Sequence, residues 1–270
     1  MKNYRLFIVS IIAIGVIFIG TSNPAKNLYK STNFISKNNI TEKENKKEDE
    51  NKRVKKNSEY TICIDPGHQE KGDPNLEPVA PGSSSKKARV SSGATGIATK
   101  KPEYKLNLEA SIVLKHILEN KGYNVVMTRE RHDVNISNAE RAILANNKNA
   151  DMVIRVHADS LDNSGKTGAS ILIPQKDGQY TSKIFEDSNK CALYIKNALV
   201  KENIQVNGIF ERNDLTGFNW SKVPVVLIEM GFMSNYNEDL MMSNPEYQRK
   251  MMQSVADGLE TYLKDTENKN

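Results

Sequence analysis

Hydrophobic and polar positions divide the chain into three stretches. Residues 6–20 form an apolar run, residues 23–58 are rich in Asn, Lys, Glu and Ser, and apolar residues recur at regular spacing from residue 59 onward. A segment with almost no core-forming residues cannot bury enough apolar area to offset the entropy lost on ordering. We therefore expect residues 23–58 to be a disordered polar linker that precedes one folded domain at 59–270.

Within residues 59–270, short apolar runs alternate with stretches in which apolar residues recur three and four positions apart. The runs predict strands, and the stretches predict amphipathic helices, one of which starts at Ser137 with Glu140 as a capping box. Such alternation is typical of an α/β domain, with a mostly parallel twisted sheet of about six strands and helices on both faces. The predicted strands are 60–65, 124–128, 152–157, 169–173 and 225–229, and the predicted helices are about 106–118, 137–147, 181–202 and 245–263.

Residues 1–22 carry Lys2 and Arg5 ahead of the apolar run. A basic flank followed by a short apolar stretch is the arrangement of a secretory signal peptide, and a retained membrane anchor has the same features. We expect an exported protein in either case, with contact to a membrane through this segment if it is retained.

Charge is distributed unevenly along the chain. Residues 1–58 contain 12 basic and 5 acidic residues, which leaves 26 basic and 28 acidic residues for 59–270. The positive net charge of +5 is thus a property of the amino-terminal part. This distribution favours attraction of that part to anionic lipid or wall polymer, and it argues against a nucleic-acid groove in the folded domain.

Two of the four histidines, His68 and His157, close predicted strands, where side chains reach the ligand-binding edge of an open α/β sheet. Catalytic zinc commonly takes two histidines and a glutamate and leaves a fourth position for water. Glu103 completes such a set with the two histidines, and Glu109 is an alternative carboxylate. We expect Zn²⁺ at this site, whereas His116 and His132 lie among polar positions that favour solvated or capping roles.

From residue 61 to about 263 the chain resembles the zinc-dependent N-acetylmuramoyl-L-alanine amidases, the amidase-3 group of bacterial cell-wall enzymes. The closing segment, with its Glu-x-Gly-Phe-x-Ser-Asn signature, is the most specific. The similar segments, in the order of the family, are Ile64-Asp-Pro-Gly-His68, Glu103-Tyr-Lys-Leu-Asn-Leu108, Val126-Met-Thr-Arg129, Arg141-Ala-Ile-Leu-Ala-Asn146, Val156-His157-Ala-Asp159 and Pro224-Val-Val-Leu-Ile-Glu229-Met-Gly-Phe-Met-Ser-Asn235.

This resemblance implies a peptidoglycan hydrolase that cleaves the amide between N-acetylmuramic acid and the L-alanine of the stem peptide with a zinc-activated water. It also places Glu103, four residues before Asn107, at the family's carboxylate-ligand position. Glu229, at the end of its strand, is then the general base that takes the water proton and gives it to the departing nitrogen.

The chain departs from the family pattern in two places. The family reads His-Gly-Gly where this chain has His68-Gln69-Glu70, and a polar insertion at 73–99 separates His68 from Glu103. The loss of two glycines restricts the backbone near the metal, and we interpret the insertion as flexible. Together these departures predict less preorganised ligands and weaker metal binding. An accessory protein that orders the metal site would then raise zinc occupancy.

Three side chains are candidates for substrate contacts. Arg155 lies two residues before His157 on the same strand face, and Arg212 falls in a predicted loop at 211–215. Either guanidinium can hold a substrate carboxylate, and a structural ion pair is the alternative for each. Asn219 precedes Trp220 in a polar loop that can cover the cleft, with ordinary packing as the alternative.

Two other functions stay open on the sequence. One is a zinc peptidase that cuts within stem peptides, and the other is a metal-poor, non-catalytic domain that binds the cell wall or a partner. A tethered domain of this size also resembles the short amidases of the spore cortex. We therefore expect location at the outer face of a bacterial membrane, in the wall, or in the intermembrane space of a forming spore.

Overall fold

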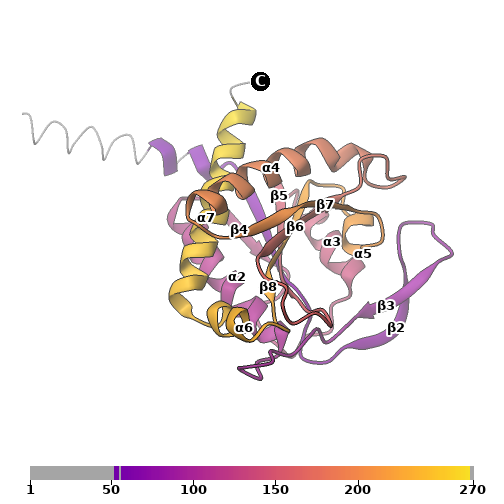
Figure 1. The fold of residues 1–270 in the computed structure, drawn as a ribbon. Coiled ribbons are helices and arrows are strands. Elements are labelled where there is room, and N and C mark those ends of the chain that lie inside the picture. Colours follow the sequence, from indigo (N-terminus) through magenta and orange to yellow (C-terminus); the bar gives the residue numbers. More distant parts are fainter. Residues whose placement is uncertain (1–51, 55, 268–270) are drawn as a thin grey trace, which may run out of the picture. The chain divides into compact units, whose positions relative to one another are not determined.

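The structure is a computed structural model that describes residues 52–54 and 56–267 (Figure 1). The predicted signal peptide or anchor at 1–22, and the linker at 23–58 up to residue 51, lie outside the described residues. At the described end of the linker, the side-chain amide of Asn57 donates to the carbonyl oxygen of Lys121 at 2.8 Å. Among the described helices, none combines the length and the apolar character that crossing a membrane requires.

A six-stranded sheet forms the centre of the domain, as predicted, and its strands lie in the order β4-β1-β5-β8-β6-β7. Neighbouring strands are parallel except β8 and β6, which pair antiparallel. The strands are β1 (Thr61–Pro66), β4 (Asn124–Met127), β5 (Met152–Asp159), β6 (Ala169–Pro174), β7 (Val206–Arg212) and β8 (Val225–Phe232).

The edge strand β7 was not predicted. Arg212 is its last residue, so the prediction that Arg212 lies in a loop at 211–215 was wrong. Asn207, Gly208 and Glu211 break the apolar pattern. Because an edge strand pairs on one side only, it can carry more polar and exposed positions than a central one; Phe210, for example, is exposed.

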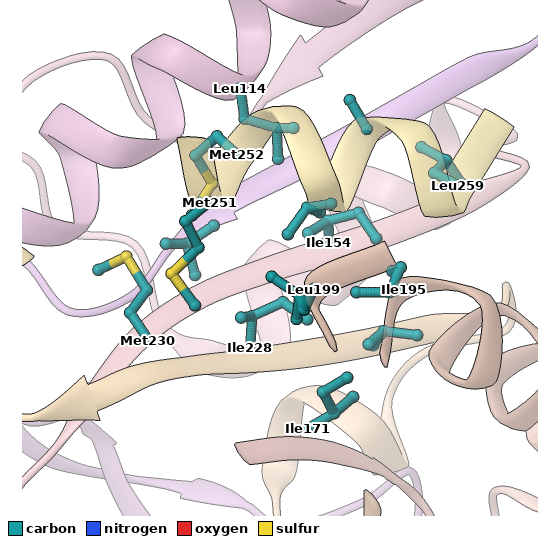
Figure 2. Close-up of a cluster of buried hydrophobic side chains, with 14 of the residues drawn as sticks. Leu114, Ile154, Ile171, Ile195, Leu199, Ile228, Met230, Met251, Met252 and Leu259 are labelled. Carbon is teal, nitrogen blue, oxygen red and sulfur yellow. The ribbon is translucent and has the colours of Figure 1, made fainter. Parts of the chain in front are cut away.

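Helices cover both faces of the sheet, as predicted. On one face, α2 (Glu103–Asn120), α4 (Ser182–Lys201) and α7 (Pro245–Glu267) pack on every second residue of the strands. Figure 2 shows Ile154, Ile171 and Ile228 of the strands meeting Leu114, Ile195, Leu199, Met251, Met252 and Leu259 of these helices. On the other face lie α3 (Asn138–Asn147), with the predicted capping box at Ser137, and the short α5 (Thr216–Asn219).

On this second face, the strand residues change from apolar to polar toward the carboxyl ends of β5 and β8. Its apolar cluster takes Val153 of β5 and Leu227 of β8, near the amino ends of these strands. Two residues further along the same faces stand Arg155 and Glu229, followed by His157 on β5. Period-two alternation therefore directs the polar groups to one face, at the carboxyl edge of the sheet.

The insertion at 73–99 is not the flexible segment that we expected. It contains a β-hairpin of β2 (Asp73–Pro78) and β3 (Lys86–Val90). The Arg89 side chain forms ion pairs with Asp73 at 3.2 Å and with Glu140 at 2.7 Å. The side-chain amide of Asn138 donates to the backbone carbonyl oxygen of Arg89. The hairpin is thus fastened to the amino end of α3, and the premise for poorly ordered ligands is wrong.

A buried carboxylate fixes the turn that follows β1. Asp65 accepts from Arg141 at 2.8 Å and from Arg155 at 2.8 Å, and all three side chains are almost fully buried. Burial by itself would raise the pKa of Asp65, but the charges of Arg141 and Arg155 outweigh it and hold this pKa below its usual range. Arg141 also donates to the carbonyl oxygens of Pro66, at 2.7 Å, and His68, at 2.9 Å.

Replacing Asp65 with Asn leaves two buried guanidiniums without their counterion, so we expect a loss of about 3–5 kcal/mol in the free energy of unfolding near neutral pH. Folding lowers the pKa of Asp65 from its ordinary value of 3.8. The ionised carboxylate therefore stabilises the folded protein fully above that value, and this contribution is lost progressively as the pH falls below 3.8 toward the folded-state pKa. Urea unfolding should therefore show a difference between wild type and Asp65→Asn that is constant above about pH 5 and shrinks below about pH 4.

The exposed Asp162→Asn is the matched control, and its stability should follow the wild type at every pH. A difference between wild type and Asp65→Asn that is as large at pH 3 as at pH 7 would contradict the assignment of this stabilisation to the Asp65 charge.

Candidate metal centre

His68 is delivered to the site by an unusual backbone. Its φ is 60°, in the left-handed region, which is uncommon for a residue with a side chain. Buried arginines hold this turn, because Arg129 donates to the carbonyl oxygen of Gly67 at 2.9 Å and Arg141 donates to that of His68. A Cβ on Gly67 would lie 2.2 Å from the ring of His157, so only glycine leaves room for the second histidine here.

Gln69, which stands where the family has glycine, is a structural part of the same turn. The residue is 1% exposed. Its oxygen accepts from the Ile136 amide at 3.0 Å and from Arg141 at 3.3 Å, while its nitrogen donates to the Lys71 carbonyl oxygen at 3.1 Å and to Asn135 at 3.3 Å. The departure from glycine thus adds hydrogen bonds that tie the His68 turn to the segment before α3.

The carboxylate of Glu103, the first residue of α2, lies between the two histidines. Its Oε1 is 3.0 Å from His68 Nε2 and 3.3 Å from His157 Nδ1. Among the described residues, these three form the cluster that can hold a metal ion, with candidate ligand atoms within 4.8 Å of one another. The alternative carboxylate, Glu109, is exposed and pairs with Lys101 instead.

The protonation states suit a cation. Burial lowers the pKa of His157 to about 4, so this imidazole is neutral near pH 7. Burial alone would raise the pKa of Glu103, but hydrogen bonds with His157 and His68 outweigh it and hold the pKa well below its usual range. Two imidazoles and an ionised carboxylate are a common donor set for zinc. Tetrahedral zinc separates its ligand atoms by about 3.3 Å, close to the contacts seen here.

Glu229 lies next to the cluster because of strand register. It pairs directly with His157 across β5 and β8, and with Ser170 of β6 on its other side. Its Oε2 is buried and has no hydrogen-bond partner. Burial, followed by the negative charges of Glu103 and Asp159, raises the pKa of Glu229 well above its usual value. This is the environment of a carboxyl that exchanges protons rather than of a surface charge.

A cavity of about 320 Å³ opens beside the cluster. It is lined by both histidines and Glu229, and on other sides by Arg155, Arg212 and Lys87, the last from the inserted hairpin. The structure therefore brings together six of the seven residues that the sequence proposed for the site. Five of them line the cavity: His68, His157, Glu229, Arg155 and Arg212. The sixth, Glu103, contacts the two histidines.

Each arginine at the cavity also forms an ion pair. Arg155 donates to Asp65, and Arg212 forms two parallel hydrogen bonds with Asp214, at 2.7 and 2.8 Å. The pair with Asp65 is buried, whereas the Arg212 side chain is 39% exposed, so the Arg155 guanidinium is the more firmly held of the two.

Asn219 is the candidate that the structure does not bring to the cavity. Its amide donates to the carbonyl oxygens of Val79 and Asn213, each at 3.2 Å, and it lines a separate pocket. Trp220 donates its indole N–H to the Pro78 carbonyl oxygen at 3.0 Å. The two side chains contact the inserted hairpin and its turn.

The histidines predicted to play other roles lie apart from the cluster. His116 is exposed, and the ring of His132 packs edge-on against Tyr104, with centroids 5.3 Å apart.

Sequence reasoning assigned no role to Asp65, and it interpreted the insertion as a flexible segment that weakens metal binding. An Asp inside an apolar strand is a usable signal, since a buried charge needs a partner. The hairpin gave no such signal, because its residues are mostly polar.

Comparisons with known proteins identify relatives of this chain. The chain is 26% identical over 203 residues to the probable cell wall amidase LytH of Staphylococcus epidermidis, covering 75% of this chain and 58% of that protein. It is 25% identical over 183 residues to the germination-specific N-acetylmuramoyl-L-alanine amidase of Bacillus subtilis, covering 60% and 70%. The chain thus spans about three-fifths of the length of the LytH relatives.

Solved structures share the fold. The apo form of the amidase Ami1 from Mycobacterium abscessus superposes with a TM-score of 0.69 at 26% identity, covering 76% of this chain and 98% of that one. The CwlD amidase from Clostridioides difficile, solved in complex with the GerS lipoprotein, superposes with a TM-score of 0.61 at 22% identity, covering 76% and 99%. The family profile described as N-acetylmuramoyl-L-alanine amidase matches residues 62–261, and the chain belongs to this Amidase_3 family.

Proposed function

We propose that the protein is a zinc-dependent N-acetylmuramoyl-L-alanine amidase, which hydrolyses the amide between N-acetylmuramic acid and the L-alanine of the peptidoglycan stem peptide. The observation that carries the proposal is the cluster of His68, Glu103 and His157 with Glu229 beside it on the neighbouring strand. The choice of this amide as the bond that is cut rests on membership of the amidase family.

His68, Glu103 and His157 would hold the zinc ion. Glu103 is itself held by donors from three directions: Asn107 and the Ala158 amide donate to Oε1 at 3.0 and 3.2 Å, and the Ala94 amide donates to Oε2 at 2.9 Å. Such outer contacts orient a ligand and add to metal affinity. When bound, zinc lowers the pKa of water to about 7 and polarises a carbonyl.

Glu229 would move the proton. Hydrolysis of an amide needs a group that accepts a proton from the attacking water and delivers it to the departing nitrogen. Glu229 faces the same cavity as the histidines, and its raised pKa suits a group that alternates between the two protonation states.

Arg155 and Arg212 would bind carboxylates of the stem peptide. Both line the cavity, and the buried pair with Asp65 holds the Arg155 guanidinium in one orientation, while Arg212 pairs with Asp214 in a more exposed position. A fixed guanidinium binds a carboxylate with less loss of entropy than a mobile side chain does.

Export to the cell wall or the spore cortex fits the predicted signal or anchor, which lies outside the described residues. The germination-specific relative favours a role with spore peptidoglycan. The GerS complex was solved for a protein of the same fold, and it motivates a search for an accessory partner of this chain. Such a partner would not be needed to order the insertion, which is already a hairpin.

Replacing His68, Glu103 or His157 by Ala removes one of three ligands, so we expect zinc bound by the purified full chain to fall from one equivalent to near none. The fold should survive, because the cluster lies at the sheet edge and outside both apolar clusters. Metal content would be measured by atomic emission, and folding by circular dichroism.

The matched control is Glu109→Ala, which alters an exposed carboxylate on the same helix and should keep its zinc. Loss of zinc in Glu109→Ala together with normal zinc in Glu103→Ala would overturn this ligand set.

Replacing Glu229 with Gln removes the proton carrier without changing the size of the side chain. We expect normal zinc content and a turnover lower by at least about 100-fold, the usual contribution of a general acid–base group. Turnover would be measured by mass spectrometry of products from a defined muropeptide. The wild type should release a peptide that begins with L-alanine.

Glu186→Gln, at an exposed position of α4, is the control and should leave turnover unchanged. Peptide fragments that leave L-alanine attached to the sugar would indicate the zinc peptidase instead. Binding of peptidoglycan without any hydrolysis would indicate the non-catalytic domain.

A further inference from the structure

The segment that leaves the inserted hairpin lies against two of the proposed ligands. His68 Nδ1 is 3.0 Å from the carbonyl oxygen of Ser91 and 2.9 Å from its Oγ. Three residues later, the amide of Ala94 donates to Glu103 Oε2. A Cβ on Gly93 would lie 2.6 Å from Glu103 Oε2 and 3.0 Å from His68 Cδ2. The backbone of residues 91–94 thus packs directly on the cluster.

The contact with Ser91 bears on which nitrogen of His68 is available to a metal. A carbonyl oxygen only accepts, so its hydrogen bond requires the proton on Nδ1. When a metal ion binds, Nε2 is then the nitrogen whose lone pair serves it, on the side of the ring that faces Glu103 Oε1, 3.0 Å away. Without the ion, a proton between Nε2 and Oε1 makes the same contact a hydrogen bond.

The hairpin holds Ser91 in this position. Val90, the residue before it, ends β3 and is buried, and Arg89 is anchored to Asp73, Glu140 and Asn138. Ser91 itself is exposed, so its hydroxyl contributes little to the core.

We propose that Ser91 is a positioning residue for the metal site, which orients the imidazole of His68 so that Nε2 faces the ion. The inserted hairpin then strengthens zinc binding, whereas a flexible insertion would weaken it. This inference rests on the proposed function, because it assumes that His68 is a zinc ligand.

The test is the zinc affinity of the full chain carrying Ser91→Ala, measured by competition with a chromophoric chelator. Loss of a contact to a ligating histidine commonly lowers metal affinity by 10- to 100-fold. Because the Ser91 carbonyl oxygen remains, we expect about a tenfold rise in the zinc dissociation constant, at the lower end of that range. The melting temperature of the metal-free protein should not change.

Two variants complete the test. Ser92→Ala removes the neighbouring exposed hydroxyl and should bind zinc like the wild type. Ser91→Thr keeps a hydroxyl and should restore most of the affinity. Equal zinc affinity in Ser91→Ala and Ser92→Ala would refute the role of Ser91 and leave the proposed amidase intact. A wild type that binds no zinc would overturn the metal site and this inference together.

Discussion

The arrangement of the site depends on one buried carboxylate. Asp65 neutralises Arg141 and Arg155, and each arginine then fixes a different part of the centre. Arg141 holds the carbonyl oxygen of His68, whose left-handed backbone needs outside support, and Arg155 occupies the strand position two before His157. A buried ion pair of this kind does not add much net stability by itself, but breaking it leaves uncompensated charge. Its value here is that it ties the turn carrying His68 to β5, the strand that carries His157.

Much of this could be predicted from the sequence, because apolar periodicity reports burial directly. The central strands and the long helices were found in this way, and the Asp-Pro-Gly-His and Val-His-Ala-Asp segments located both histidines at strand ends. The choice of Glu103 over Glu109 came from a motif landmark rather than from periodicity. The structure agrees with that choice, since Glu103 lies between the histidines while Glu109 pairs with Lys101.

The errors have a common physical origin. The hairpin at 73–90, the edge strand β7 and the turn at Gln69 are stabilised by polar contacts between segments far apart in the sequence, such as Arg89 with Glu140. These contacts leave no periodic pattern. Polar residues were therefore interpreted as flexibility in the insertion, and a glutamine in place of glycine was interpreted as a weakness. In the structure, Gln69 is one of the most buried polar side chains, and the insertion is a hairpin attached to α3.

The hairpin has a consequence for how this protein can change. It supplies Lys87 and Ala88 to the wall of the cavity, and a few residues later it leads into the segment that contacts His68 and Glu103. Under the proposed function, substrate preference and metal retention would both depend on this one short stretch of chain. Lengthening, shortening or exchanging this hairpin would alter both properties at once, so engineering a new specificity at this wall would need compensating changes between residues 91 and 94.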